Sequence, residues 1–143
     1  MYQKVIIVGN LGRDPEMRYM PDGTAVTNFS VATTRRWTNK ATGEPVEETA
    51  WFRVSVWGRQ AETANQYLAR GRKVLVEGVL QVERGTGGPR TYTRQDGTVG
   101  ASFEIRADTV RFLSSRQDDD GYVPVGDDDG GMDVSYEEDD IPF

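Results

Sequence analysis

The chain has 143 residues, room for one domain and a tail, and its hydrophobic content of 36% suits a small β-rich core. Cysteine and histidine are absent, which excludes disulfides, thiol nucleophiles, histidine acid–base pairs and the usual zinc ligands. The net charge of -6 is uneven, because residues 1–116 carry +5 and residues 117–143 carry -11. This division is typical of a nucleic-acid-binding body with an acidic tail, although the tail could serve solubility alone.

The first predicted strand is the β-branched run at residues 4–8, which we expect to be buried on both faces or paired at an interface. No apolar stretch approaches the roughly 20 residues of a membrane span, and no signal-type segment precedes this strand, so we expect a cytoplasmic protein. A second strand, with one inward face, is predicted over residues 26–34. Trp37 follows at its end, before a polar loop over residues 38–48, and either contacts a ligand or folds back over the core.

A third strand, at residues 51–58, has two unlike rows of side chains, because successive residues of a strand point to opposite faces. One row is apolar: Phe52, Val54 and Val56. The other combines two indoles, a guanidinium and a hydroxyl, from Trp51, Arg53, Ser55 and Trp57. A buried arginine would need a partner, whereas bases stack on indoles and arginine binds phosphate. The second row therefore favours a nucleic-acid-binding face, with burial under a helix or a subunit contact as the alternative.

The remaining elements complete a barrel pattern. Residues 60–70 have helical spacing, with Gly71 as the expected stop, and residues 73–82 form a strand with a predicted bulge at Gly78. A flexible loop at residues 83–89 and a turn precede a last strand at residues 102–107. Five strands with one helix between the third and fourth predict an all-β fold over residues 1–113. It is a five-stranded Greek-key OB-fold barrel, whose second and third strands bind oligonucleotides.

The acidic tail holds too little apolar surface to offset the entropy of ordering, so residues 114–136 are predicted to form a disordered linker. Residues 137–143 have the character of a peptide ligand, since a terminal phenylalanine presents a ring beside a carboxylate. The residues expected to bind a partner protein are Asp139, Asp140, Ile141, Pro142 and Phe143. The alternative is a frayed terminus. The aspartate runs lack the spacing of an EF-hand loop.

Several segments together resemble the bacterial single-stranded DNA-binding proteins, a homotetrameric OB-fold family. They are residues 8–15, 18–23, 40–44, 51–58, 67–71 and 139–143. The resemblance implies base stacking by Trp37, Trp51 and Trp57. We place a fourth stacking position on Tyr92, with residues 83–89 as an insertion; another gap would place it on Gly85. It also implies phosphate contacts from Lys40, Arg53, Arg59, Arg70, Arg72 and Lys73.

The resemblance further implies assembly through the first strand and recruitment of replication, recombination and repair proteins by the terminal peptide, with no catalysis and no cofactor. The chain departs from the family in two ways. Several family positions near Gln81 and Glu83 that are positively charged are not basic here, and a short acidic linker replaces a long Gly-, Gln- and Pro-rich one. Three other functions are weighed against single-stranded DNA (ssDNA) binding: an OB-fold primosomal or adaptor protein, a metal-dependent nuclease using the tail aspartates, and an RNA-binding protein.

Overall fold

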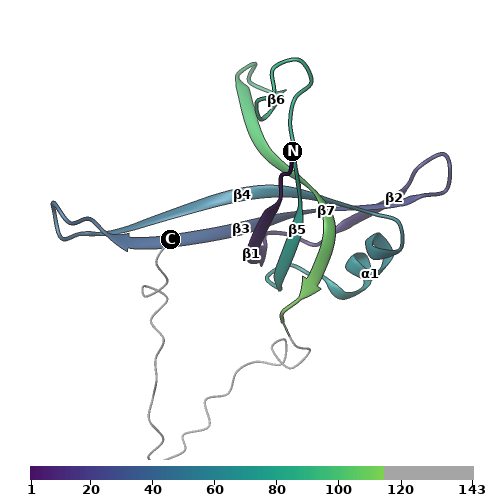
Figure 1. Cartoon of the computed structure of the whole chain (residues 1–143), viewed down its shortest axis with the longest axis horizontal. Coiled ribbons are helices and arrows are strands. Elements are labelled where there is room, and N and C mark those ends of the chain that lie inside the picture. The colour runs from purple at the N-terminus through teal and green to yellow at the C-terminus, as the bar shows by residue number, and fades with distance from the viewer. Residues whose placement is uncertain (115–143) are drawn as a thin grey trace, which may run out of the picture.

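The computed structural model describes residues 1–114, which contain seven strands and one helix (Figure 1). In chain order the elements are β1 (Val5–Leu11), β2 (Glu16–Tyr19), β3 (Ala25–Thr38), β4 (Pro45–Trp57), α1 (Arg59–Tyr67), β5 (Lys73–Gln81), β6 (Arg90–Thr93) and β7 (Val99–Phe112). Apart from Ser114, the predicted linker and terminal peptide lie outside the described residues. Within residues 1–114, no helix has the length and apolar character needed to cross a bilayer.

Five of the strands close into a barrel. They pair in the order β1, β5, β7, β4 and β3, and β1 returns to β3 at Asn10↔Ala32 and Leu11↔Val31. The β4–β7 pair is parallel, whereas the other barrel pairs are antiparallel. The helix α1 joins β4 to β5, the third and fourth barrel strands. The predicted all-β OB-fold barrel is thus confirmed.

The core lies inside this barrel and is built by strand alternation. Most of the buried strand residues are β-branched, which suits the pleated surface that each strand presents. The fully buried ones include Val31, Val54, Val56, Val74, Val76 and Ile105. On α1, Ala61 and Ala64 are buried against this core, and the Thr27 hydroxyl donates a 2.6 Å hydrogen bond to the Ala61 carbonyl. The helix is therefore fixed to the barrel by both packing and a buried polar contact.

Two glycines allow the barrel strands to approach closely. The β5–β7 register shifts between Glu77 and Gly78, which confirms the predicted bulge. A Cβ atom on Gly78 would meet the backbone of Arg106, and one on Gly9 would meet the backbone of Ala32. Both positions therefore require glycine, because backbone cannot move aside as a flexible side chain can.

The largest difference from the predicted elements is the β3–β4 hairpin. Its strands pair continuously from Val26↔Trp57 to Thr38↔Pro45, so the polar loop predicted over residues 38–48 shrinks to residues 39–44. The hairpin extends as an arm beyond the barrel (Figure 1). Strands without a buried face lack apolar alternation, and cross-strand pairs support this part instead: Thr34–Thr49, Arg35–Glu48 and Arg36–Glu47.

Other boundaries also differ. The first strand is not buried on both faces: Ile6 and Val8 are 58% and 47% exposed, so that alternative was wrong. The helix ends at Tyr67, before Gly71, and β7 is longer than the predicted residues 102–107. The short strands β2 and β6 were not predicted, because four residues carry too little periodicity to be recognised.

Candidate nucleic-acid interface

The outward row of β4 forms the centre of the site. Trp51 and Trp57 are 53% and 37% exposed, whereas Val54 and Val56 of the other row are buried. The two rows predicted from alternation are therefore separated by the barrel wall. Six positions part the two tryptophans, so they are about 20 Å apart along the strand. The row is a track on the barrel surface.

An open hollow of about 610 Å³ lies along one end of this track, between β3, β4, β7, β6 and the segment that follows β1. Of the predicted site residues, it brings together Trp51, Arg53 and Tyr92. Asn28 and Ser30 of β3 and Phe103 of β7 also line it. The hollow thus combines flat aromatic surface, hydrogen-bonding groups and a guanidinium.

The indole of Trp51 lies directly against the backbone at Gly12. A Cβ atom on Gly12 would come within 2.5 Å of the Trp51 ring, so the ring occupies the space of the missing side chain. The Gly12 amide is itself fixed by a 3.1 Å hydrogen bond to the Ser30 carbonyl. The Cζ3–Cη2 edge of the indole therefore lies against the backbone at Gly12.

Tyr92 is supported in a similar way. It pairs with Gly100 across the β6–β7 ladder, and its ring covers the space that a Gly100 side chain would fill. The Arg94 guanidinium lies 5.5 Å from the ring centroid and donates a 3.1 Å hydrogen bond to the Val99 carbonyl. Gly85, the alternative for this stacking position, lies outside the hollow.

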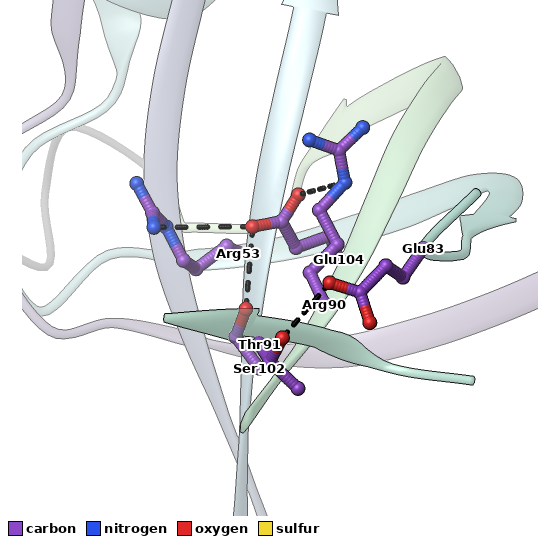
Figure 2. Close-up of polar contacts among 6 residues, drawn as sticks. All are labelled: Arg53, Glu83, Arg90, Thr91, Ser102 and Glu104. Carbon is purple, nitrogen blue, oxygen red and sulfur yellow. Dashed lines mark hydrogen bonds and ion pairs between the residues drawn. The ribbon is translucent and has the colours of Figure 1, made fainter. Parts of the chain in front are cut away.

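Arg53 belongs to an ion-pair network that crosses three strands (Figure 2). Its Nη1 lies 3.8 Å from Glu104 Oε1, and Arg90 Nε lies 3.3 Å from Glu104 Oε2. The Ser102 hydroxyl donates a 3.2 Å hydrogen bond to the same carboxylate. Neither Arg90 nor Glu104 was predicted from the sequence. Glu104 could have been placed by alternation, because the inward Ile105 forces its neighbours outward.

Trp57, at the other end of the track, lies within cation–π distance of an arginine. The Arg106 guanidinium lies 5.8 Å from the Trp57 ring centroid, and Arg106 pairs with Ser55 across the parallel β4–β7 ladder. The predicted phosphate-binding residue Arg59 is exposed at the start of α1, two positions after Trp57. Arg106 was also missed, although the alternation that places Glu104 outward places Arg106 outward as well.

Trp37 and Lys40 lie apart from the hollow, on the arm. Trp37 is five positions along β3 from Ala32, the partner of Trp51, so the two indoles are about 17 Å apart and face opposite sides of the hairpin. The Arg35 guanidinium lies 4.6 Å from the Trp37 ring centroid. Lys40 is exposed in the turn that closes the arm.

Of the predicted phosphate-binding residues, Arg70 and Arg72 lie in the connection from α1 to β5, and Lys73 is the first residue of β5. This connection is fixed to the segment after β1, since the Arg70 amide donates a 2.9 Å hydrogen bond to Asp14 Oδ1 and the Gly71 amide donates to the Leu11 carbonyl. None of the three lines the hollow, but Asp14 does. Of the three, Arg70 is joined to a residue of the hollow, through this hydrogen bond to Asp14.

Comparison with known proteins places the chain in a family. The model of the single-strand binding protein family matches residues 2–113. The chain belongs to this family. Two similar relatives are the single-stranded DNA-binding proteins of Neisseria meningitidis serogroups A and B, each 42% identical over 121 residues, or 85% of this chain. The matched part spans 65% of the length of those relatives.

Solved structures of single-strand binding proteins have the same fold. A Plasmodium falciparum SSB in complex with ssDNA gives a TM-score of 0.66 at 25% identity, covering 80% of this chain and 97% of that one. A deletion mutant of the Thermus aquaticus single-stranded DNA-binding protein gives a TM-score of 0.60 at 28% identity, covering 79% of this chain and 51% of that one.

For a member of the single-strand binding protein family, the hollow is close to neutral. Its charged lining residues are Arg13 and Arg53 against Asp14, Glu16 and Glu48, which gives a net charge of -1. Among residues 1–114, two carboxyls have a pKa below the ordinary value, and both lie in turns outside the hollow. The pKa of Asp22 is lowered by hydrogen bonds from the backbone and side chain of Thr24, and that of Asp96 by hydrogen bonds from the side chain and backbone of Thr98. Flat aromatic surface, more than charge, therefore distinguishes the hollow.

Proposed function

We propose that the chain binds single-stranded DNA without sequence preference, by stacking bases on the aromatic side chains of the barrel. The observation that carries this proposal is the outward row of β4, where two exposed indoles flank an arginine and a third aromatic ring, Tyr92, shares the hollow with Trp51. Support comes from the names of the Neisseria relatives and from the Plasmodium SSB, which is in complex with ssDNA.

Stacking suits this role because every base has a π-face. Each stacked base contributes roughly 1–3 kcal/mol. Duplex DNA hides those faces, so it should bind far more weakly. Phosphate contacts make the affinity depend on salt. The logarithm of the binding constant falls against the logarithm of the salt concentration with a slope of about -0.7 per neutralised phosphate. We assign these contacts to Lys40, Arg53, Arg59, Arg70, Arg72 and Lys73.

The strand is proposed to follow the track from the hollow past Arg53 to Trp57, where Arg59 and Arg106 lie close to its phosphates. Trp37 and Lys40, on the arm, would form a second contact region that a longer oligonucleotide reaches. Short and long oligonucleotides should therefore differ in how many of the three tryptophans they quench.

The chain is also proposed to form a homotetramer. Ile6 and Val8 of β1 are exposed, and Leu75, the partner of Val8 on β5, lies beside them on the outer surface. An apolar strip on the outside of a barrel is characteristic of an interface between identical subunits. Four OB barrels at roughly 4 to 16 nucleotides each would cover some 16 to 64 nucleotides.

The cellular role proposed for the chain is binding and protection of DNA, without catalysis, during replication, recombination and repair in the cytoplasm. Residues 137–143 are proposed to recruit partner proteins. The Phe143 ring would enter a pocket of the partner, and its terminal carboxylate would bind a basic residue there. This part rests on the family resemblance of the terminal peptide, which lies outside the described residues.

Quenching of tryptophan fluorescence tests the central proposal. The protein is titrated with poly(dT) and with duplex DNA, each at low and high salt. Strong, saturable quenching by poly(dT) alone is expected, with weaker binding at high salt. Little quenching by either nucleic acid would contradict the proposal, because all three tryptophans are assigned to stacking, and would favour the adaptor function.

A further inference from the structure

Glu104 occupies a position that DNA binding alone does not explain. Its side chain is an acid on the face proposed to bind a polyanion, and it is only 23% exposed, whereas the Arg53 and Arg90 side chains that it pairs with are 67% and 54% exposed. An acid that served only solubility would lie at the surface. A carboxylate at this depth, beneath two exposed cations, is placed to hold them.

The carboxylate connects three strands. Glu104 is on β7, Arg53 is its direct neighbour on β4, and Arg90 pairs with Ser102, two positions before Glu104. One carboxylate oxygen faces Arg53 and accepts from Ser102, and the other faces Arg90. Figure 2 shows the two guanidinium groups approaching the carboxylate from different sides. A single acid is thus shared between two cations that come from different strands.

The same contact fixes the strand that carries Tyr92. Alternation places Arg90 and Tyr92 on one face of β6, two residues apart. The Arg90–Glu104 pair holds that face, while on the other face the Thr91 hydroxyl donates a 2.8 Å hydrogen bond to Glu83 (Figure 2). The strand β6 has four residues and, within residues 1–114, pairs with β7 alone, so these two contacts give it lateral support.

We propose that Glu104 is a positioning residue for ssDNA binding. It holds Arg53 and Arg90 as a pair whose outer N–H groups bind one stretch of backbone phosphate, and it holds β6 so that Tyr92 faces the hollow. Both guanidinium groups keep most of their donors free for such a ligand, because each meets the carboxylate through a single nitrogen. This inference rests on the proposed function and adds a residue of opposite charge to the site.

The test depends on whether the affinity for DNA rises or falls when the charge of Glu104 is removed. Glu104→Gln keeps the shape of the side chain and removes one negative charge. If Glu104 only repelled phosphate, the variant would bind a dT oligonucleotide more tightly. Positioning predicts the reverse, about fivefold weaker binding, since a neutral amide holds two guanidinium groups less firmly. Glu62→Gln, on α1, makes the same change of charge away from the hollow and should leave the affinity unchanged. Tighter or unaltered binding by Glu104→Gln overturns the proposal.

A double-mutant cycle separates positioning from a general loss of structure. In an Arg90→Gln background the weakening caused by Glu104→Gln should shrink to about twofold, because only the Arg53 contact remains to be lost. A global fold defect would weaken both backgrounds equally, and that result would count against the proposal. If Glu104→Gln does not fold, Arg90→Gln alone decides: this exposed side chain should cost severalfold in affinity, and no loss overturns the inference.

A measurement without DNA keeps the two proposals distinguishable. Amide hydrogen exchange at residues 90–93 should be faster in Glu104→Gln than in the wild-type chain, while exchange in β4 stays the same. Equal exchange at β6 overturns the positioning of Tyr92, even if DNA binding is intact. Failure of the wild-type chain to bind dT, with faster exchange in the variant, overturns the proposed function and the phosphate-binding part, and leaves the support of β6 standing.

Discussion

The indole of Trp51 has its Cζ3–Cη2 edge against the backbone at Gly12, and it lines the hollow. Such a ring needs little reordering when a base arrives, because Gly12 has removed most of its freedom beforehand. Tyr92 has the same arrangement over Gly100. At the scale of single residues, the site is built from aromatic rings supported by glycines, and this pairing can be tested from either side.

Removal of the Trp51 ring should weaken ssDNA binding strongly. Trp51→Ala is expected to lose one stacked base, or about 1–3 kcal/mol, which is roughly fivefold to 150-fold in affinity. Fluorescence anisotropy with a labelled dT oligonucleotide measures the change. Tyr19→Ala is the matched control, since Tyr19 is a similarly exposed aromatic residue that does not line the hollow. Comparable losses in the two variants would contradict the assignment.

A methyl group at Gly12 should displace the same ring, because it would occupy the space that the ring now fills. Gly12→Ala would displace the Trp51 indole and reduce the affinity for ssDNA in the same direction as Trp51→Ala, without removing any aromatic surface. Gly88→Ala is the control, because a Cβ atom there meets only ordinary contact with Thr86. Unchanged affinity in Gly12→Ala would show that the ring does not need its support. The near-ultraviolet circular dichroism of the folded variant reports whether the indole has moved.

At the scale of elements, the sequence predicted the orientation of side chains wherever a strand has a face buried in the core. The β4 rows followed from alternation, because Val54 and Val56 had to face inward. The arm was predicted as a loop because Arg35 and Glu48 pair across strands with no buried face. Glu104 and Arg106 were missed since outward positions of a strand look ordinary until their neighbours are known. Tyr92, placed at the fourth stacking position from the sequence, lines the hollow, whereas Gly85 does not.

The outer face of β1 is the element expected to join subunits. Ile6→Asp should place a charge in that interface and shift the protein from tetramer to smaller species, because a buried unpaired carboxylate costs several kcal/mol. Sedimentation velocity at micromolar concentration measures the species present. Val99→Asp changes another exposed valine outside the strip and should leave the assembly intact. A tetramer that persists in Ile6→Asp would exclude this face as the interface.

At the scale of the whole molecule, the charge of the body and that of the tail have opposite signs, +5 over residues 1–116 and -11 over residues 117–143. A tethered anionic segment competes with DNA at a high local concentration. Removal of residues 117–143 should therefore tighten ssDNA binding at low salt, and the difference should narrow at high salt because the attraction is screened. Titrations of full-length and truncated protein with poly(dT) measure this. Equal affinities at low salt would contradict the competition.

Closure of the barrel has a consequence for solubility as well as for binding. A protein with exposed tryptophan and valine side chains is at risk of aggregation. Such aggregation begins where an unpaired edge strand of one copy pairs with a strand of another. Here the five barrel strands pair in a ring, and within residues 1–114 the strands with one neighbour are β2 and β6, each four residues long. Both edges carry charge, from Glu16 and Arg18 on β2 and Arg90 on β6. Within residues 1–114 the strands of the arm pair only with each other beyond the barrel, and this part carries charge at Arg35, Glu47 and Glu48. The fold can thus expose aromatic rings while its sheet edges are short or charged.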